Sequence, residues 1–173
     1  KASLFKIPVV GWLLRASGQI PVEREGGSRD ANAGNPMGAA NQLIRKKAGV
    51  IVYPEGTLTR DPELWPMRGK SGAVRLALES GIPLIPVAHW GAEAIMPRYG
   101  KLSVWPLRRR VRVLIGEPVD LSEFQRAEGQ PSLLVAATAK LMNELAELLA
   151  VLRGIPAPPE RWNPSEHGQK ETG

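Results

Sequence analysis

The sequence predicts an α/β fold with a largely parallel or mixed central sheet flanked by helices. An uninterrupted run of β-branched and aromatic residues at positions 50–53 indicates a strand buried on both faces, as strands of parallel sheets are. A helical segment within residues 69–79 follows, and a second, nearly continuous apolar strand covers residues 83–90. Strand, helix and strand joined by short connections form a βαβ pattern, which implies a parallel sheet covered by helices.

The start of the chain predicts a short helix or turn and a short strand. Residues 4–16 are apolar, but Pro8 and Gly11 interrupt the run, and it is shorter than the ~20 residues that span a bilayer. The sequence leaves open whether this segment lies in a membrane interface or packs in the core. Residues 18–23 are expected to form a short strand, with Ile20 and Val22 on one face.

A second helix is expected from about Asn35 to about Lys47. Asn35 is a suitable N-cap, and Pro36 fits the first turn, where its missing N–H costs nothing. Three cations at positions 45–47 complement the negative end of the helix dipole. Gly49 is expected to end the helix.

The last third of the chain predicts one strand and one long helix. Residues 110–115 are rich in valine and indicate a strand, and residues 131–152 indicate a helix that is too charged to span a membrane. From residue 154 onward, proline, glycine and charge dominate. We therefore expect one domain over residues 1–153, incomplete at its N-terminus, and an irregular or disordered tail over residues 154–173.

The composition restricts the kinds of site and partner. The chain has no cysteine, which excludes disulfides and cysteine-ligated zinc. Its formal net charge is +6, which favours an anionic partner such as a phospholipid, a phosphate-bearing substrate or a nucleic acid. The chain begins with Lys1 rather than methionine, and no signal-peptide pattern opens it, so we expect it to be part of a longer protein.

The most informative segment for chemistry is the loop that follows the predicted strand at 50–53. Ligands of α/β sheets bind beyond the carboxyl ends of strands, where this loop is expected to lie. Gly56 allows a ligand to approach the backbone closely, Thr57 and Thr59 offer hydroxyls, and Arg60 offers a planar cation suited to phosphate. Taken alone, Pro54-Glu55-Gly56-Thr57 is equally compatible with an ordinary turn.

Three segments together carry a stronger signal. They are Gly18-Gln-Ile-Pro-Val-Glu-Arg24, Tyr53-Pro-Glu-Gly-Thr57 and Ile82-Pro-Leu-Ile-Pro-Val87. In order and spacing they resemble three of the four sequence blocks of the glycerolipid acyltransferases, the family of the 1-acyl-glycerol-3-phosphate acyltransferases. Gly69-Lys70, before a predicted helix, fits the same pattern, and the resemblance covers about residues 1–119.

The resemblance implies transfer of an acyl group from acyl-CoA or acyl carrier protein to the hydroxyl of a lysophospholipid. It assigns Arg24 to the acceptor's phosphate, Glu55, Gly56 and Thr57 to the acceptor pocket, and Pro86 to the pocket wall. Arg60 and Lys70 are further candidate cations for phosphate. No metal or bound cofactor is implied, because the thioester donor is a co-substrate. The implied location is the cytoplasmic face of the membrane, peripheral or anchored through residues outside this chain.

Two departures from the family pattern bear on activity. The family has an arginine where this chain has Leu58, and Arg60 is a candidate replacement. The family's first block, His-x-x-x-x-Asp, supplies a general base and its orienting carboxylate, and it is not present here. His89 has Glu93 one residue too close, and His167 lies in the tail. We therefore expect no catalytic residue in this chain and little or no transferase activity from it alone.

Alternatives remain open at the sequence level. The basic run at 108–112 suits either anionic lipid headgroups or a solvated strand edge guarded against pairing. A non-catalytic module that binds anionic lipids or phosphorylated ligands is the alternative to an enzyme. A nucleic-acid partner is not expected, because aromatic residues do not alternate with the cations as stacking platforms require.

Overall fold

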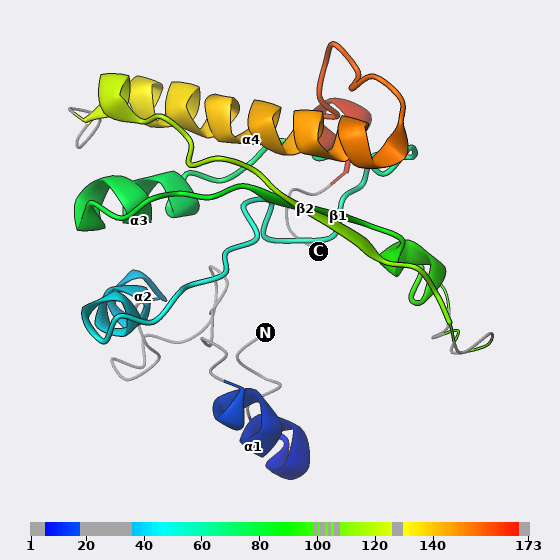
Figure 1. The fold of residues 1–173 in the computed structure, drawn as a ribbon, viewed down its shortest axis with the longest axis horizontal. Helices are drawn as coiled ribbons and strands as arrows, with labels where there is room; N and C mark the ends of the chain where they lie inside the picture. The colour runs from blue at the N-terminus through cyan, green and yellow to red at the C-terminus, as the bar shows by residue number, and fades with distance from the viewer. Residues whose placement is uncertain are drawn as a thin grey trace. The chain divides into compact units, whose positions relative to one another are not determined.

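The computed structural model describes residues 6–17, 36–98, 100, 103, 105, 108–125 and 130–169. The chain forms two compact units, residues 1–51 and residues 52–173. The first unit contains helix α1 (Pro8–Ala16) and helix α2 (Pro36–Arg45). The second contains helix α3 (Gly72–Ser80), strands β1 (Val87–Trp90) and β2 (Arg112–Ile115), and the long helix α4 (Pro131–Arg153), as labelled in Figure 1.

The two helices of the first unit agree with the predicted positions. Helix α1 begins with Pro8 at its first position and carries Arg15 in its last turn, which are favourable places for both residues. Helix α2 likewise begins at Pro36. Its end differs in detail, because the left-handed residue that follows it is Lys47 (φ 58°) rather than Gly49. The predicted strand at 18–23 and the predicted N-cap Asn35 lie outside the described residues.

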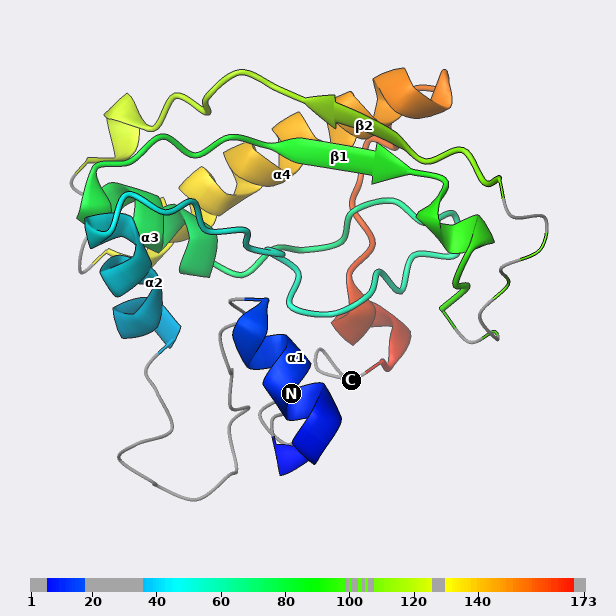
Figure 2. The ribbon, with the colours of Figure 1, turned by 60° about the horizontal axis from the view of Figure 1, so that its bottom comes forward.

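The sheet is a two-stranded antiparallel ladder. Val87 pairs with Ile115 at one end, and Trp90 pairs with Arg112 at the other. Two hydrogen bonds continue the pairing, from the Gly116 N–H to the Pro86 carbonyl (2.9 Å) and from the Val119 N–H to the Leu84 carbonyl (2.9 Å). Figure 2 shows the two segments side by side over this length. The strands stay short because prolines at 83, 86 and 118 have no N–H to donate to the ladder.

The prediction of a parallel central sheet is not confirmed, although helices do pack on a sheet. Among the described residues the only strand pair is antiparallel, and residues 50–53 form no strand. Ile51 is 88% exposed and Tyr53 is 73% exposed. A run of apolar residues becomes a buried strand only when a neighbouring strand accepts its hydrogen bonds and helices cover its faces. Residues 50–53 have neither within the part of the chain that the structure describes, so the apolar pattern alone gave the wrong assignment.

Helix α4 supplies the largest share of the core. With α3 and the segment before η3 (Ser122–Phe124), it encloses one buried cluster that includes Val74, Ala137 and Leu141. Toward its C-terminal end it packs on the sheet and encloses a second cluster, of Trp65, Ala88, Leu149 and Leu152. Gly154, in the left-handed conformation at φ 71°, ends the helix.

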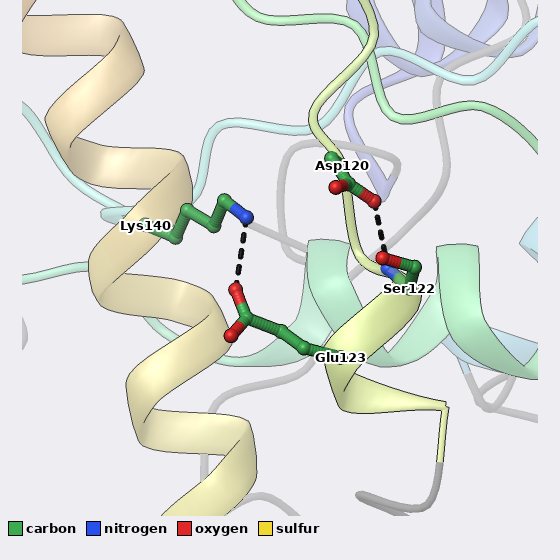
Figure 3. A network of polar contacts seen from close by, with 4 residues as sticks. All are labelled: Asp120, Ser122, Glu123 and Lys140. Atoms are coloured by element: carbon green, nitrogen blue, oxygen red, sulfur yellow. Dashed lines mark hydrogen bonds and ion pairs between the residues drawn. The ribbon is translucent and has the colours of Figure 1, made fainter.

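Two polar contacts order the segment before α4, and one of them joins it to that helix, as Figure 3 shows. Asp120 Oδ1 accepts a hydrogen bond from the Ser122 N–H at 3.0 Å, which starts η3, and hydrogen bonds from Ser122 lower the pKa of Asp120. Lys140 Nζ of α4 lies 2.9 Å from Glu123 Oε1, and this contact raises the pKa of Lys140. Both pairs are exposed, so they position the segment more than they stabilise the fold.

The segment after α4 folds back onto that helix over its described part, residues 154–169. The Arg161 guanidinium donates to the Ala139 carbonyl (3.0 Å) and to Asn143 Oδ1, and burial lowers the pKa of Arg161. Trp162 and His167 stack with ring centroids 3.6 Å apart across the short helix η4 (Pro164–His167). No helix in the described part of the chain is long and apolar enough to cross a membrane.

The packing against α4 predicts a strict requirement for glycine at position 69. A Cβ on Gly69 would lie 2.6 Å from Met142 Sδ and 3.1 Å from Thr138 Cγ2, and Met142 is 0% exposed. Because Met142 has no solvent to move into, Gly69→Ala should lower the free energy of unfolding by about 1–3 kcal/mol. Urea unfolding measures the change. Gly72→Ala is the matched control, since a Cβ there meets nothing within 4 Å, and it should be neutral or slightly stabilising.

Candidate acceptor site

The loop of residues 54–70 is closed at its base by backbone hydrogen bonds. The Gly56 N–H donates to the Tyr53 carbonyl at 3.0 Å and makes a turn in which Gly56 takes a positive φ of 67°. The Lys70 N–H donates to the Pro54 carbonyl at 2.7 Å. The two ends of the loop therefore meet, and Lys70 is brought back beside the Pro54-Glu55-Gly56-Thr57 segment.

The far part of the loop is held by its own side chains. Thr59 Oγ1 donates to the Trp65 carbonyl at 2.6 Å and accepts from the Asp61 N–H at 3.2 Å. Asp61 is buried, and its Oδ1 accepts from the Glu63 N–H at 2.6 Å. The Thr59 hydroxyl and the Asp61 carboxylate thus build the loop, because both are engaged inside it.

Glu55 is the titratable group of this loop with a shifted pKa. Its Oε2 accepts a hydrogen bond from the Met67 N–H at 3.0 Å, across the loop. Burial raises the pKa of Glu55, the bond from Met67 lowers it in part, and the nearby Asp61 carboxylate raises it further. A carboxyl group that is desolvated in this way is suited to hydrogen-bonding a polar ligand, and such groups concentrate at functional sites.

Lys70 crosses the turn at Gly56. A Cβ built on Gly56 would lie 3.7 Å from Lys70 Cδ and 3.8 Å from Lys70 Nζ. The lysine side chain therefore lies over the glycine, with its ammonium group next to the exposed backbone of the turn. Thr57, the next residue, is half-buried. Four of the predicted contacts, Glu55, Gly56, Thr57 and Lys70, are thus joined within one loop.

The remaining predicted positions are placed differently. Arg24 lies outside the described residues. Arg60 is half-buried in the same loop, and its N–H is 2.9 Å from Met67 Sδ. Pro86 is buried at the sheet, where a Cβ on Gly116 would be 3.0 Å from its Cγ and 3.0 Å from Leu148 of α4. Its role in a pocket wall stays a prediction.

The two histidines do not join the loop by any contact seen here. His89 is exposed on β1 and pairs with Val113 of β2, and His167 stacks on Trp162. Within the part of the chain that the structure describes, no three or more His, Asp or Glu side chains gather as metal ligands would. The loop therefore offers two binding groups beside one turn, the Lys70 ammonium group and the half-buried carboxyl group of Glu55.

One residue that fixes the loop was missed by the sequence analysis. Arg153, the last residue of α4, places its guanidinium carbon 4.2 Å from the Trp65 ring centre and 4.5 Å from the Trp90 ring centre. Its Nη1 also donates to the Glu63 carbonyl at 2.8 Å. Arg153 thus ties the loop to β1 and α4. The only sequence signal for this role is weak, because a cation in the last turn of a helix already has an ordinary explanation.

Residues 1–90 match the Acyltransferase family, just over half of the chain. The chain belongs to this family. It is 32% identical over 119 residues to the 1-acyl-sn-glycerol-3-phosphate acyltransferase BAT2, chloroplastic, of Brassica napus, covering 69% of this chain and 33% of that relative. It is 25% identical over 154 residues to the 1-acyl-sn-glycerol-3-phosphate acyltransferase of Escherichia coli, covering 85% of this chain and 59% of that relative.

The comparisons confirm the resemblance seen in the three sequence blocks. The chain spans between about a third and three fifths of the length of these two relatives. No solved structure matches the chain. The family match ends at residue 90, so it includes the loop of residues 54–70, α3 and β1, whereas β2 and α4, against which these elements pack, lie beyond it.

The raised pKa of Glu55 predicts a pH-dependent effect of Glu55→Gln. Because the folded pKa lies above the ordinary value of 4.5, folding favours the protonated carboxyl group. The stability that Glu55 contributes is fully present below pH 4.5 and is lost as the pH rises through the folded pKa. Glutamine cannot ionise, so the variant should gain stability relative to the parent across this window.

Urea unfolding at a series of pH values from 4 to 8 tests this prediction. Glu63→Gln is the control for the loss of one carboxylate, since Glu63 is exposed in the same loop. A Glu55→Gln difference that is flat over the whole range would show that burial does not raise the pKa of Glu55.

The position of Arg153 predicts that lysine cannot replace it. Lysine keeps the charge but has no planar group to stack on two indole rings. Arg153→Lys should lower the free energy of unfolding by about 1 kcal/mol and speed amide hydrogen exchange in residues 59–67. The exposed Arg75 of α3 provides the control, because Arg75→Lys should leave both measurements near the parent values. Unchanged exchange in the loop of the Arg153 variant would contradict the assignment.

Proposed function

We propose that the protein transfers an acyl group to the free hydroxyl of a lysophospholipid such as 1-acyl-glycerol-3-phosphate, in phospholipid synthesis. The donor is an acyl-CoA or an acyl carrier protein thioester, with no bound cofactor. Membership of the Acyltransferase family and the names of the curated relatives support this proposal. We further propose that the enzyme acts at the cytoplasmic face of the membrane, peripherally or through an anchor outside these residues.

The observation that carries the proposal is the position of Lys70 over the Gly56 turn. An acceptor phosphate needs a cation at a place that it can approach closely, and an ammonium group beside a glycine turn suits that need. The buried carboxyl group of Glu55, on the same turn, is suited to a hydroxyl of the glycerol. The Thr57 hydroxyl is the second proposed hydrogen-bonding group for the glycerol. Arg60 and Arg24 are the proposed additional phosphate contacts.

The chemistry requires one further group. The acceptor hydroxyl oxygen attacks the thioester carbonyl, a C–O bond forms, the C–S bond breaks, and the hydroxyl proton must be removed while the leaving thiolate gains one. The 173 residues contain no His-x-x-x-x-Asp block. We therefore propose that they supply acceptor binding, and that the general base comes from outside residues 1–173. In this form the chain alone has little or no transferase activity.

A non-catalytic module that binds anionic lipids or phosphorylated ligands is the second candidate. Two observations favour it, namely the net charge of +6 and the lack of a His-x-x-x-x-Asp block in these residues. Both candidates use the same cation over the same turn, so binding alone does not separate them.

The decisive assay is acyl transfer from a long-chain acyl-CoA to 1-acyl-glycerol-3-phosphate. It compares residues 1–173 with the chain extended through its upstream coding sequence, and activity is expected only from the extended chain. Activity of residues 1–173 would show that they contain the base and would return attention to His89. If neither form is active with several acceptors and with an acyl carrier protein donor, the binding module is the better assignment.

In an active extended chain, Lys70→Ala should lower kcat/KM for the acceptor by about 10–100-fold. The loss corresponds to one charge-assisted contact with phosphate of about 1.5–3 kcal/mol. Arg75→Ala removes an exposed cation five residues away and should leave kcat/KM unchanged. An Lys70 variant with parental kinetics for both substrates would remove Lys70 from the acceptor site.

A further inference from the structure

Positive charge is most concentrated in one segment of the chain. Residues 94–116 hold six of the 23 Lys and Arg residues and none of the 17 Asp and Glu residues. The rest of the chain is balanced, with 17 residues of each sign, so this segment accounts for the whole net charge of +6. Cations that are scattered over a surface only keep a protein soluble, whereas cations gathered in one segment create a local field that attracts an anionic partner.

This segment includes β2 and most of the connection from β1 to β2, and the coloured part of that connection extends past the C-terminal end of α4 in both views (Figures 1 and 2). Arg108, Arg109, Arg110 and Arg112 are all exposed. Arg109 also orders the connection, because its Nη2 donates to the Trp105 carbonyl at 2.8 Å and to Ser103 Oγ at 3.2 Å.

Large apolar side chains are exposed beside these cations. Trp105 is 76% exposed and Met96 is 66% exposed, and both belong to the connection between the strands. Arginines that guard a strand edge would explain the charge without any partner. They do not explain why a tryptophan and a methionine are exposed in the same connection.

We propose that this end of the sheet docks onto an anionic lipid surface. The docking surface, called the basic edge here, consists of Met96, Trp105, Arg108, Arg109, Arg110 and Arg112. Arginine heads bind lipid phosphates, tryptophan favours the headgroup region of a bilayer, and methionine can enter the acyl boundary. A nucleic acid is the less suitable partner, because within the basic edge a single exposed aromatic ring, Trp105, accompanies four arginines.

Contacts link the basic edge to the loop of residues 54–70. Arg112 of the edge pairs with Trp90 across the sheet, and Arg153 stacks on both Trp90 and Trp65. Docking would therefore hold the loop close to the lipid surface in which a lysophospholipid acceptor lies. This last step rests on the proposed function, whereas docking itself does not.

Vesicle co-sedimentation tests the docking surface directly, using the whole 173-residue chain. The test variant is Arg108→Gln, Arg110→Gln and Arg112→Gln, which keeps Arg109 because that residue orders the connection. The control variant is Arg45→Gln, Lys46→Gln and Lys47→Asn. It also removes three positive charges, from exposed residues at and just after the end of α2. Asparagine is chosen at position 47 because it accepts the positive φ found there.

The parent chain should bind phosphatidylcholine vesicles that contain phosphatidylserine, and should release them as salt rises. Each arginine near an anionic surface contributes about a fivefold change in binding, so the test variant should bind about a hundredfold more weakly. The control variant should stay within a few-fold of the parent. Trp105→Ala should weaken binding several-fold, and that loss should persist at high salt.

Several outcomes would overturn the proposal. Equal losses in the test and control variants would show that only net charge matters. Unchanged binding of the test variant would exclude the basic edge, provided that circular dichroism shows all variants folded. Tighter binding of a single-stranded oligonucleotide than of the vesicles, lost in the test variant, would assign the edge to nucleic acid. Vesicle binding is measured without acyl transfer, so its failure and the failure of the proposed reaction are distinguishable.

Discussion

Close packing against α4 is the constraint on which the second unit depends. Its buried residues meet α3, the sheet and the end of the loop of residues 54–70, and at Gly69 the backbone comes so near to Met142 that no side chain fits between them. Such contact excludes water from both sides of the interface and fixes the distance between the elements, because protein interiors are packed as densely as organic crystals. The contact of Gly69 with Met142 therefore fixes where the loop ends and where the neighbouring Lys70 begins.

The loop itself is stabilised by a different kind of interaction. Its backbone polar groups are satisfied by Thr59, Asp61 and Glu55 from within, and Arg153 then fastens it to two tryptophans. A loop with its own polar interior can hold ligand groups in place without a surrounding sheet. This explains how Glu55, Gly56, Thr57 and Lys70 are brought together although residues 50–53, just before them, form no strand.

The basic edge and the loop of residues 54–70 are two different surfaces, and a chain of contacts links them. The phosphate-binding groups proposed for the loop are single cations at a turn, whereas the basic edge gathers its arginines around an exposed tryptophan. The first arrangement suits one small anion, and the second suits an extended anionic surface. The path from Arg112 through Trp90 and Arg153 to Trp65 joins the two through stacked rings and one strand pair.

The sequence by itself determined the family, the helices and the residues of the candidate loop. Proline at helix starts and glycine or cations at helix ends are local signals, and they placed α1, α2 and α4 to within a few residues. The three blocks likewise needed no tertiary information to be matched. Only the tertiary structure decided the pairing of β1 with β2, the exposure of Ile51 and Tyr53, and the role of Arg153. The physical reason is that a strand partner or a stacking contact depends on residues distant in sequence. The local pattern of apolar and charged residues does not show which distant residues will meet.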